Sequence, residues 1–224
     1  MDNVIPGVTL ELNKESDKSI KLSIDPDRKS IKDSVIAFIG YYNQLLTNIQ
    51  IFTRTDENIV DSVEYFTEEE KKKAKERLGV LQGDVTLMQL KSRLQQIMMD
   101  PYPAGENAQI SLLAQIGVST NAAPLARSGG MDASKLRGYL EINEQILDGV
   151  LKNNLPAVQK LFGNDTDGDL VIDSGVAYAV DIHARPYIQS GGIIAQRLNN
   201  LETQIGRANQ EIENYNKKLA QKEQ

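Results

Sequence analysis

Residues 193–224, IIAQRLNNLETQIGRANQEIENYNKKLAQKEQ, carry apolar side chains at alternating steps of four and three residues. This spacing keeps the apolar side chains on one stripe of an α-helix and is typical of a coiled-coil seam. The seam residues are Ile194, Leu198, Leu201, Ile205, Ala208, Ile212, Tyr215 and Leu219. A seam needs a second helix against which it packs, so the stretch predicts a C-terminal coiled-coil helix together with a partner for it.

The composition of the 224-residue chain argues against several classes of function. There is no Cys and a single His, His183, which argues against disulfides, thiolate metal sites and catalytic triads. We interpret His183 as a helix-surface or partly buried residue rather than a base, because the sequence assigns it no Ser or Asp partner. The net charge of −6, without a basic stripe, predicts no nucleic-acid partner. No apolar run approaches a membrane span, and we expect no cofactor.

Alternating apolar residues predict two antiparallel strand pairs. The first pair comprises residues 8–12 and 20–24, and the second comprises residues 116–120 and 139–142 around a long loop that contains Gly. The opening MDNVIPGVTLEL has neither the basic region nor the apolar run of a signal peptide and enters a strand at once. We therefore expect Met1 to be a start placed inside a longer protein.

Helical spacing of apolar residues predicts that helices make up most of the remaining chain. An N-cap at Asp25 is expected to precede a helix over residues 31–49, and residues 53–61 are interpreted as a polar linker. A capping box is expected in residues 67–70, and Gly83-Asp84 is expected to cap the next helix. Further helices are expected after Asn143, around Val158 and Leu161, and from Val176 to Arg185-Pro186, followed by a flexible joint at Ser190-Gly191-Gly192.

These elements predict an α+β fold that is mostly α-helical, with a helical body, two β-hairpins and a C-terminal coiled-coil helix. We divide the chain into a hairpin at 1–24, a helical body with the inserted hairpin at 25–189, and a Gly-Gly joint with the coiled-coil helix at 190–224. Apolar stripes within one domain bury against each other, so the helices are expected to share one core. Its predicted members are Phe38, Tyr42, Leu45, Leu90, Leu94, Ile97, Leu147, Leu151, Leu161 and Phe162.

One segment, NDTDGDLVID at residues 164–173, has the spacing of metal ligands. Alternating carboxylates in a turn are how calcium loops gather oxygen ligands, but Leu170 stands where an EF-hand loop has Gly, and Val176 stands where it has Glu. We interpret the segment as a solvated acidic turn without a metal, and keep a calcium site as the alternative. The candidate ligands are Asp165, Asp167, Asp169 and Asp173.

Several stretches, taken in order, resemble one known family. They are IPGVTLEL, SIKLSI, AFIGYYNQLL, LGVLQGDVTL, SLLAQIGVST, GYLEI, NLPAVQKLFG and SGGIIAQRLNNLETQI. They contain the short motifs Tyr42-Asn43, Gly83-Asp84, Leu113–Gly117, Pro156 to Gly163, and Gly191-Gly192 with Arg197. In the fourth motif Val158 stands one position earlier than in the family pattern. This ordered set resembles the C-terminal half of the flagellar filament cap proteins, the hook-associated protein 2 family. Two segments depart from the family pattern: residues 56–78 are longer and more charged, and residues 165–173 resemble an insertion.

The resemblance implies a structural protein rather than an enzyme. Caps of this family are exported to the filament tip, where a ring-like homo-oligomer holds newly arrived flagellin while it folds and inserts. The implied partners are flagellin, hook–filament junction proteins and other copies of the cap. The implied location is the extracellular flagellum, or the periplasm in organisms that keep their flagella there. The seam at residues 190–224 would belong to a leg paired with an N-terminal helix or a neighbouring subunit, and residues 1–24 would join the head.

Two other classes of function stay open as alternatives to the cap. The first is a calcium-stabilised secreted adhesin or binding module with a coiled-coil stalk, which would depend on the acidic turn. The second is an enzyme that works through Asp or Glu side chains, a chemistry that the composition leaves open.

Overall fold

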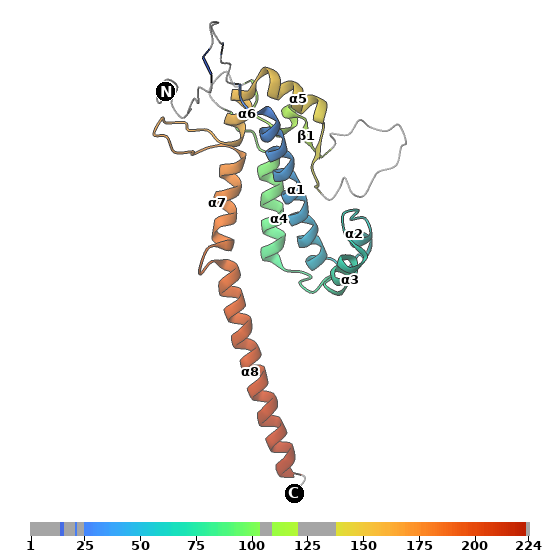
Figure 1. Cartoon of the computed structure of the whole chain (residues 1–224). Coiled ribbons are helices and arrows are strands. Elements are labelled where there is room, and N and C mark those ends of the chain that lie inside the picture. The colour runs from blue at the N-terminus through green and yellow to red at the C-terminus, as the bar shows by residue number, and fades with distance from the viewer. Residues whose placement is uncertain (1–13, 16–20, 22–24, 104–108, 121–137, 223–224) are drawn as a thin grey trace.

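The computed structural model describes the chain from residue 25 to residue 222 except for 104–108 and 121–137, together with residues 14, 15 and 21. It is a body of packed helices from which one long helix extends (Figure 1). Helices α1, α4 and α7 pack side by side, and the short α5 and α6 lie at one end of them. The elements are α1 (Arg28–Thr53), α2 (Asn58–Asp61), α3 (Glu68–Glu76), α4 (Val85–Met99), the 3-10 helix η1 (Leu113–Ile116), β1 (Val118–Ser119), β2 (Glu141–Ile142), α5 (Glu144–Asn153), α6 (Leu155–Phe162), α7 (Val176–Ile188) and α8 (Ile193–Lys222).

Helices α1, α3, α4 and α5 begin at side chains that cap their free backbone N–H groups. Asp84 accepts from the N–H of Leu87 at 3.0 Å, and Thr67 forms a capping box with Glu70, as the sequence predicts. The predicted cap at Asp25 is wrong, because Asp27 accepts from the N–H of Ser30 at 3.0 Å and α1 starts after it. The two aspartates flank a Pro, and the pattern alone favours the wrong one.

The core forms where the apolar sides of α1, α4, α5 and α6 meet. Most of the predicted members are buried in it, and Leu94, Leu147 and Leu161 are each 2% exposed or less. Phe38 and Phe162 are half-buried against this core, with their rings in an edge-to-face contact at 5.8 Å between centroids. Such aromatic pairs stabilise packing beyond the area that they bury. Leu45 is an incorrect prediction, because its side chain is 42% exposed.

The second predicted strand pair is present but short, and α1 holds it in place. β1 and β2 pair antiparallel, with Val118 opposite Ile142. The side-chain amide of Asn43 accepts from the N–H of Leu140 at 2.9 Å and donates to its carbonyl oxygen at 2.8 Å. This double hydrogen bond satisfies both backbone groups of Leu140, as a neighbouring strand would. The first predicted strand pair, at residues 8–12 and 20–24, lies outside the described residues.

The segment interpreted as a polar linker contains a helix instead. α2 buries Ile59 and Val60, which pack with Ile51 of α1 and Ala74 of α3 in a second, smaller apolar cluster. Lys75 of α3 reaches Asp61 of α2 at 2.8 Å. The helix has only four residues, so it presents no periodic stripe by which the sequence could reveal it.

Replacement of Leu94 with Ala tests the assignment of the core. Leu94 is 2% exposed in the middle of α4, so the substitution leaves a cavity and is expected to lower the free energy of unfolding by about 2–5 kcal/mol. Urea denaturation measures the change. Met88→Ala on the same helix is the control, because Met88 is 55% exposed and its loss is expected to cost far less. Equal losses for the two variants would contradict the orientation of α4.

Candidate functional site: an exposed helix–helix surface

The seam predicted from the sequence lies on α8, away from the helical body (Figure 1). Its seven large apolar side chains are between 46% and 66% exposed, and no residue of α8 is buried in the described structure. They form one continuous stripe on the helix, because their spacing is close to two turns per seven residues. A continuous exposed apolar stripe of this length marks a surface that another chain segment covers.

The remaining faces of α8 are polar and suit contact with water. Lys217 and Glu213 form an ion pair one turn apart at 2.7 Å, and the hydroxyl of Thr203 donates to the carbonyl oxygen of Asn199 at 2.9 Å. A helix with one apolar stripe and polar flanks pairs through the stripe alone. The seam of α8 therefore stays a predicted coiled-coil surface.

The joint between α7 and α8 is built by two glycines. Gly191 has φ +71°, a left-handed conformation that favours Gly, and a Cβ added there would meet nothing within 4 Å. A Cβ on Gly192 would lie 2.6 Å from the carbonyl oxygen of Pro186, so only Gly fits that turn. The side-chain amide of Gln196 donates to the carbonyl oxygen of Gly191 at 2.9 Å and closes the start of α8 over the joint.

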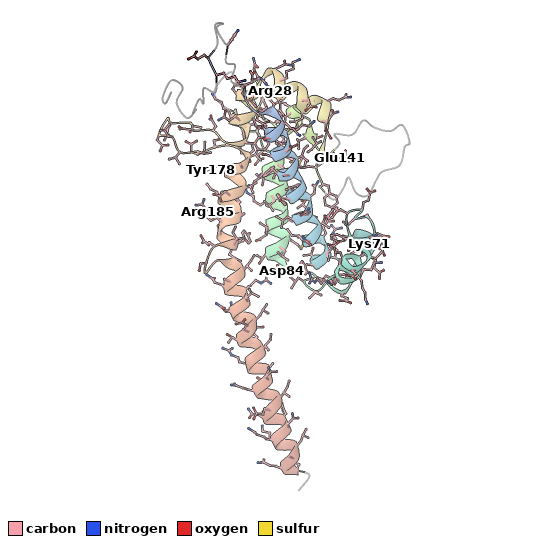
Figure 2. All side chains as sticks on the ribbon, viewed as in Figure 1. Arg28, Lys71, Asp84, Glu141, Tyr178 and Arg185 are labelled. Carbon is pink, nitrogen blue, oxygen red and sulfur yellow. The ribbon has the colours of Figure 1, made fainter. Side chains whose placement is uncertain are left out.

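An ion pair joins α8 to the body just beyond this joint. The guanidinium of Arg197 contacts the second carboxylate oxygen of Asp84, whose first oxygen caps α4. Figure 2 labels Asp84 at the end of α4 that faces the departing α8. The side chain of Asp84 is 4% exposed, and the guanidinium beside it holds the pKa of its carboxyl below the usual range.

The acidic turn is a closed loop between α6 and α7. Asn164 and Ser174 pair as an isolated β-bridge at its base. Asp165 accepts from the N–H groups of Gly168 at 2.7 Å and Leu170 at 2.9 Å, which holds the pKa of its carboxyl below the usual range, with the bond from Gly168 as the main cause.

The four candidate ligands of that loop do not share one arrangement. Asp165, Asp167 and Asp173 each place one carboxylate oxygen within 4.8 Å of the others. Asp169 is not part of this group, and its carboxylate accepts from the N–H of Val171 at 2.8 Å. Several of the carboxylate oxygens already accept backbone hydrogen bonds, which a calcium ion would have to replace. The solvated turn therefore stays our prediction for these residues.

One open cavity of the described body has no arrangement of catalytic groups around it. That cavity, of about 660 Å³, lies between α1 and α6 and is lined by Pro26, Ile31, Ser34, Val35, Phe38, Leu155, Val158, Gln159 and Phe162. None of these lining residues has an ionisable side chain. His183 lies elsewhere, half-buried on α7, with its Nε2 atom 3.1 Å from the guanidinium of Arg93 on α4.

A helical body that carries a long helix with an exposed seam is typical of proteins that assemble through helix–helix contacts. The family model described as the flagellar hook-associated protein 2 C-terminus matches residues 1–224. The chain therefore belongs to the flagellar hook-associated protein 2 C-terminus family. No solved structure gives a significant match to it.

Curated relatives agree with the family model. The chain is 42% identical over 213 residues to a flagellar hook-associated protein 2 of Treponema maltophilum, covering 95% of this chain and 32% of the relative. It is 42% identical over 203 residues to that of Treponema pallidum, covering 91% and 28%. It is 29% identical over 223 residues to an A-type flagellar hook-associated protein 2 of Pseudomonas aeruginosa, covering 99% and 39%. The chain spans about a third of the length of the two Treponema relatives.

The comparisons support the flagellar interpretation and give no support to the adhesin alternative. Among the helices that the structure describes, none combines the length and the hydrophobicity that a membrane span requires.

Acid titration of the unfolding free energy tests the environment of Asp84. Its carboxyl has a lowered pKa in the folded chain, so its stabilising contribution is present above the ordinary value of 3.8 and is lost as the pH falls through the folded-state pKa. Asp84→Asn keeps a good N-cap but cannot carry the charge. The difference in stability between the parent and this variant is expected to be constant near neutral pH and to vanish in acid. A difference that persists unchanged in acid would contradict the ion pair.

Calcium titration tests the acidic turn. With the carboxylates engaged by backbone N–H groups, millimolar Ca²⁺ is expected to leave the melting temperature unchanged, because a ligand raises stability only when it binds the native state. Asp167→Asn is the matched variant that removes one carboxylate of the group. A rise in melting temperature with Ca²⁺ that Asp167→Asn abolishes would establish a calcium site.

Proposed function

We propose that this chain is part of the cap at the tip of the bacterial flagellar filament, which promotes the folding and insertion of flagellin during filament growth. Membership of the flagellar hook-associated protein 2 C-terminus family supports the flagellar assignment. The observation that carries the assembly role is the exposed seam of α8, whose large apolar side chains are 46% to 66% exposed and belong to neither of the described apolar clusters. The chemistry of a cap is assembly, so we assign no catalytic residues and no cofactor.

The seam is proposed to pair with a helix outside these 224 residues. This helix would come from another segment of the protein or from a neighbouring subunit. Self-pairing of two α8 helices is the weaker alternative. In such a pair the small Ala208 and the large Tyr215 would fill the layers of the coiled-coil core unevenly. The three-part organisation follows from this proposal. Residues 25–189 form the body, residues 190–224 form a leg, and residues 1–24 join the head.

The proposed partners are flagellin, the proteins of the hook–filament junction and further copies of the cap in a ring-like homo-oligomer. The proposed location is the extracellular flagellum, or the periplasm in an organism whose filaments lie there. Nucleic acid and membrane are not proposed partners. The support for this is the net charge of −6 and the polar faces of α8 that flank the seam.

Charged substitutions in the seam test the proposal in the full-length protein. Ile205→Asp with Ile212→Asp places two carboxylates in adjacent layers of the coiled coil, where burial of a charge without a partner is costly. The double variant is expected to lose the ring-like oligomer in light scattering and to abolish filament growth. Thr203→Asp with Gln210→Asp on the opposite face of α8 is the matched control and is expected to behave like the parent.

The 224-residue chain by itself is expected to be monomeric or weakly associated at low micromolar concentration. Its unpaired α8 is expected to exchange amide hydrogens quickly beyond about Gly206, because a helix without tertiary contacts is marginal in water. In the full-length protein the same amides are expected to be protected. A tight oligomer of the 224-residue chain would place the main interface elsewhere, and a full-length protein that stays monomeric and supports no filament growth would contradict the cap itself.

A further inference from the structure

In the described structure α8 contacts the body mainly through the joint with α7. The helix leaves the body after Gly191 and Gly192 and buries none of its own residues. The joint is compact at Gly192 and open at Gly191, where a side chain would meet nothing within 4 Å. A joint of this kind allows α8 to rotate unless a contact outside the joint restrains it.

Such a contact is present one turn into α8, between Arg197 and Asp84. Asp84 is a rigid anchor because its carboxylate caps α4 through the N–H of Leu87 and is almost fully buried. The preceding Gly83, with φ +79°, and the hydrogen bond from the N–H of Asp84 to the carbonyl oxygen of Leu81 at 3.1 Å fix its backbone. The side chain of Arg197 is 48% exposed and belongs to α8.

We propose that the Asp84–Arg197 ion pair is a latch that fixes the orientation of α8 on the helical body, with residues 189–192 as the hinge. The latch holds by a charge-assisted contact to a carboxylate that water hardly reaches, so it is less screened than a surface ion pair. Loss of either partner releases the hinge without breaking the core. The inference concerns this chain alone and does not depend on the proposed function.

The length of α8 makes this orientation important. A 30-residue helix is about 45 Å long at 1.5 Å per residue, so a rotation of about 10° at the hinge moves its far end by roughly 8 Å. That displacement is close to the distance between two packed helices. The latch therefore decides where the seam residues at the end of α8 are presented.

Distances between two spin labels test the latch directly. The chain has no Cys, so Ser92→Cys on α4 and Gln204→Cys on α8, before the part of α8 that is expected to fray, introduce two labelling sites at exposed positions without background. Double electron–electron resonance on the labelled 224-residue chain is expected to give one narrow distance distribution. Asp84→Asn and Arg197→Gln, made separately in this background, are each expected to broaden the distribution at least twofold.

Matched variants separate a latch from a general loss of structure. Asp84→Asn keeps the cap of α4, and Arg207→Gln removes a cation further along α8 that is expected to leave the distribution narrow. The double variant Asp84→Asn with Arg197→Gln is expected to be no broader than either single variant, because both remove the same contact. Circular dichroism confirms that each variant is folded, and the exposed Arg197 keeps the test open if Asp84→Asn does not fold.

Two results would overturn the latch. A distribution that stays narrow in folded Arg197→Gln would show that the joint alone fixes α8. A distribution that is already broad in the parent chain would show that the ion pair does not restrain the helix in solution.

Discussion

The structure depends on the burial of α1, because this helix contacts almost every other part of the body. One side of it carries Val35, Ile39 and Leu46 into the main core against α4 and α5, and its last turns supply Ile51 to the second cluster with α2 and α3. Between these, Asn43 holds the backbone of the strand pair by two hydrogen bonds. A single helix thus organises two apolar clusters and one sheet, and most of the remaining elements are short.

The body and α8 differ in how their helices are stabilised. Body helices bury their stripes within the chain, and the removal of apolar surface from water is the main force that stabilises them. α8 exposes its whole stripe, so only local helix propensity and ion pairs such as Lys217–Glu213 support it in isolation. This contrast connects the fold to the proposed assembly: the body packs around its own core, whereas the seam is proposed to gain its stabilisation when another helix covers it.

Local chemistry was predictable from the sequence, and long-range geometry was not. The caps at Thr67, Asp84 and Asn143 follow from side chains within four residues of the backbone groups that they bind. The exposure of Leu45 and the burial of α2 depend on which neighbours fold onto them, which periodicity does not encode. The pairing of Asp84 with Arg197 was also not predicted from the sequence, although both residues belong to the motifs that carry the family resemblance.

Asp84 serves two purposes that different substitutions separate. Asn at this position keeps the cap of α4 and removes the charge for Arg197, whereas Ala removes both. The acidic turn is remote from this contact, because it precedes α7 while the joint follows it, and thirteen residues of helix span about 20 Å. An ion bound in that turn would therefore have to act through the packing of α7 on α4. Changes in the turn and changes at Asp84 are thus expected to be independent.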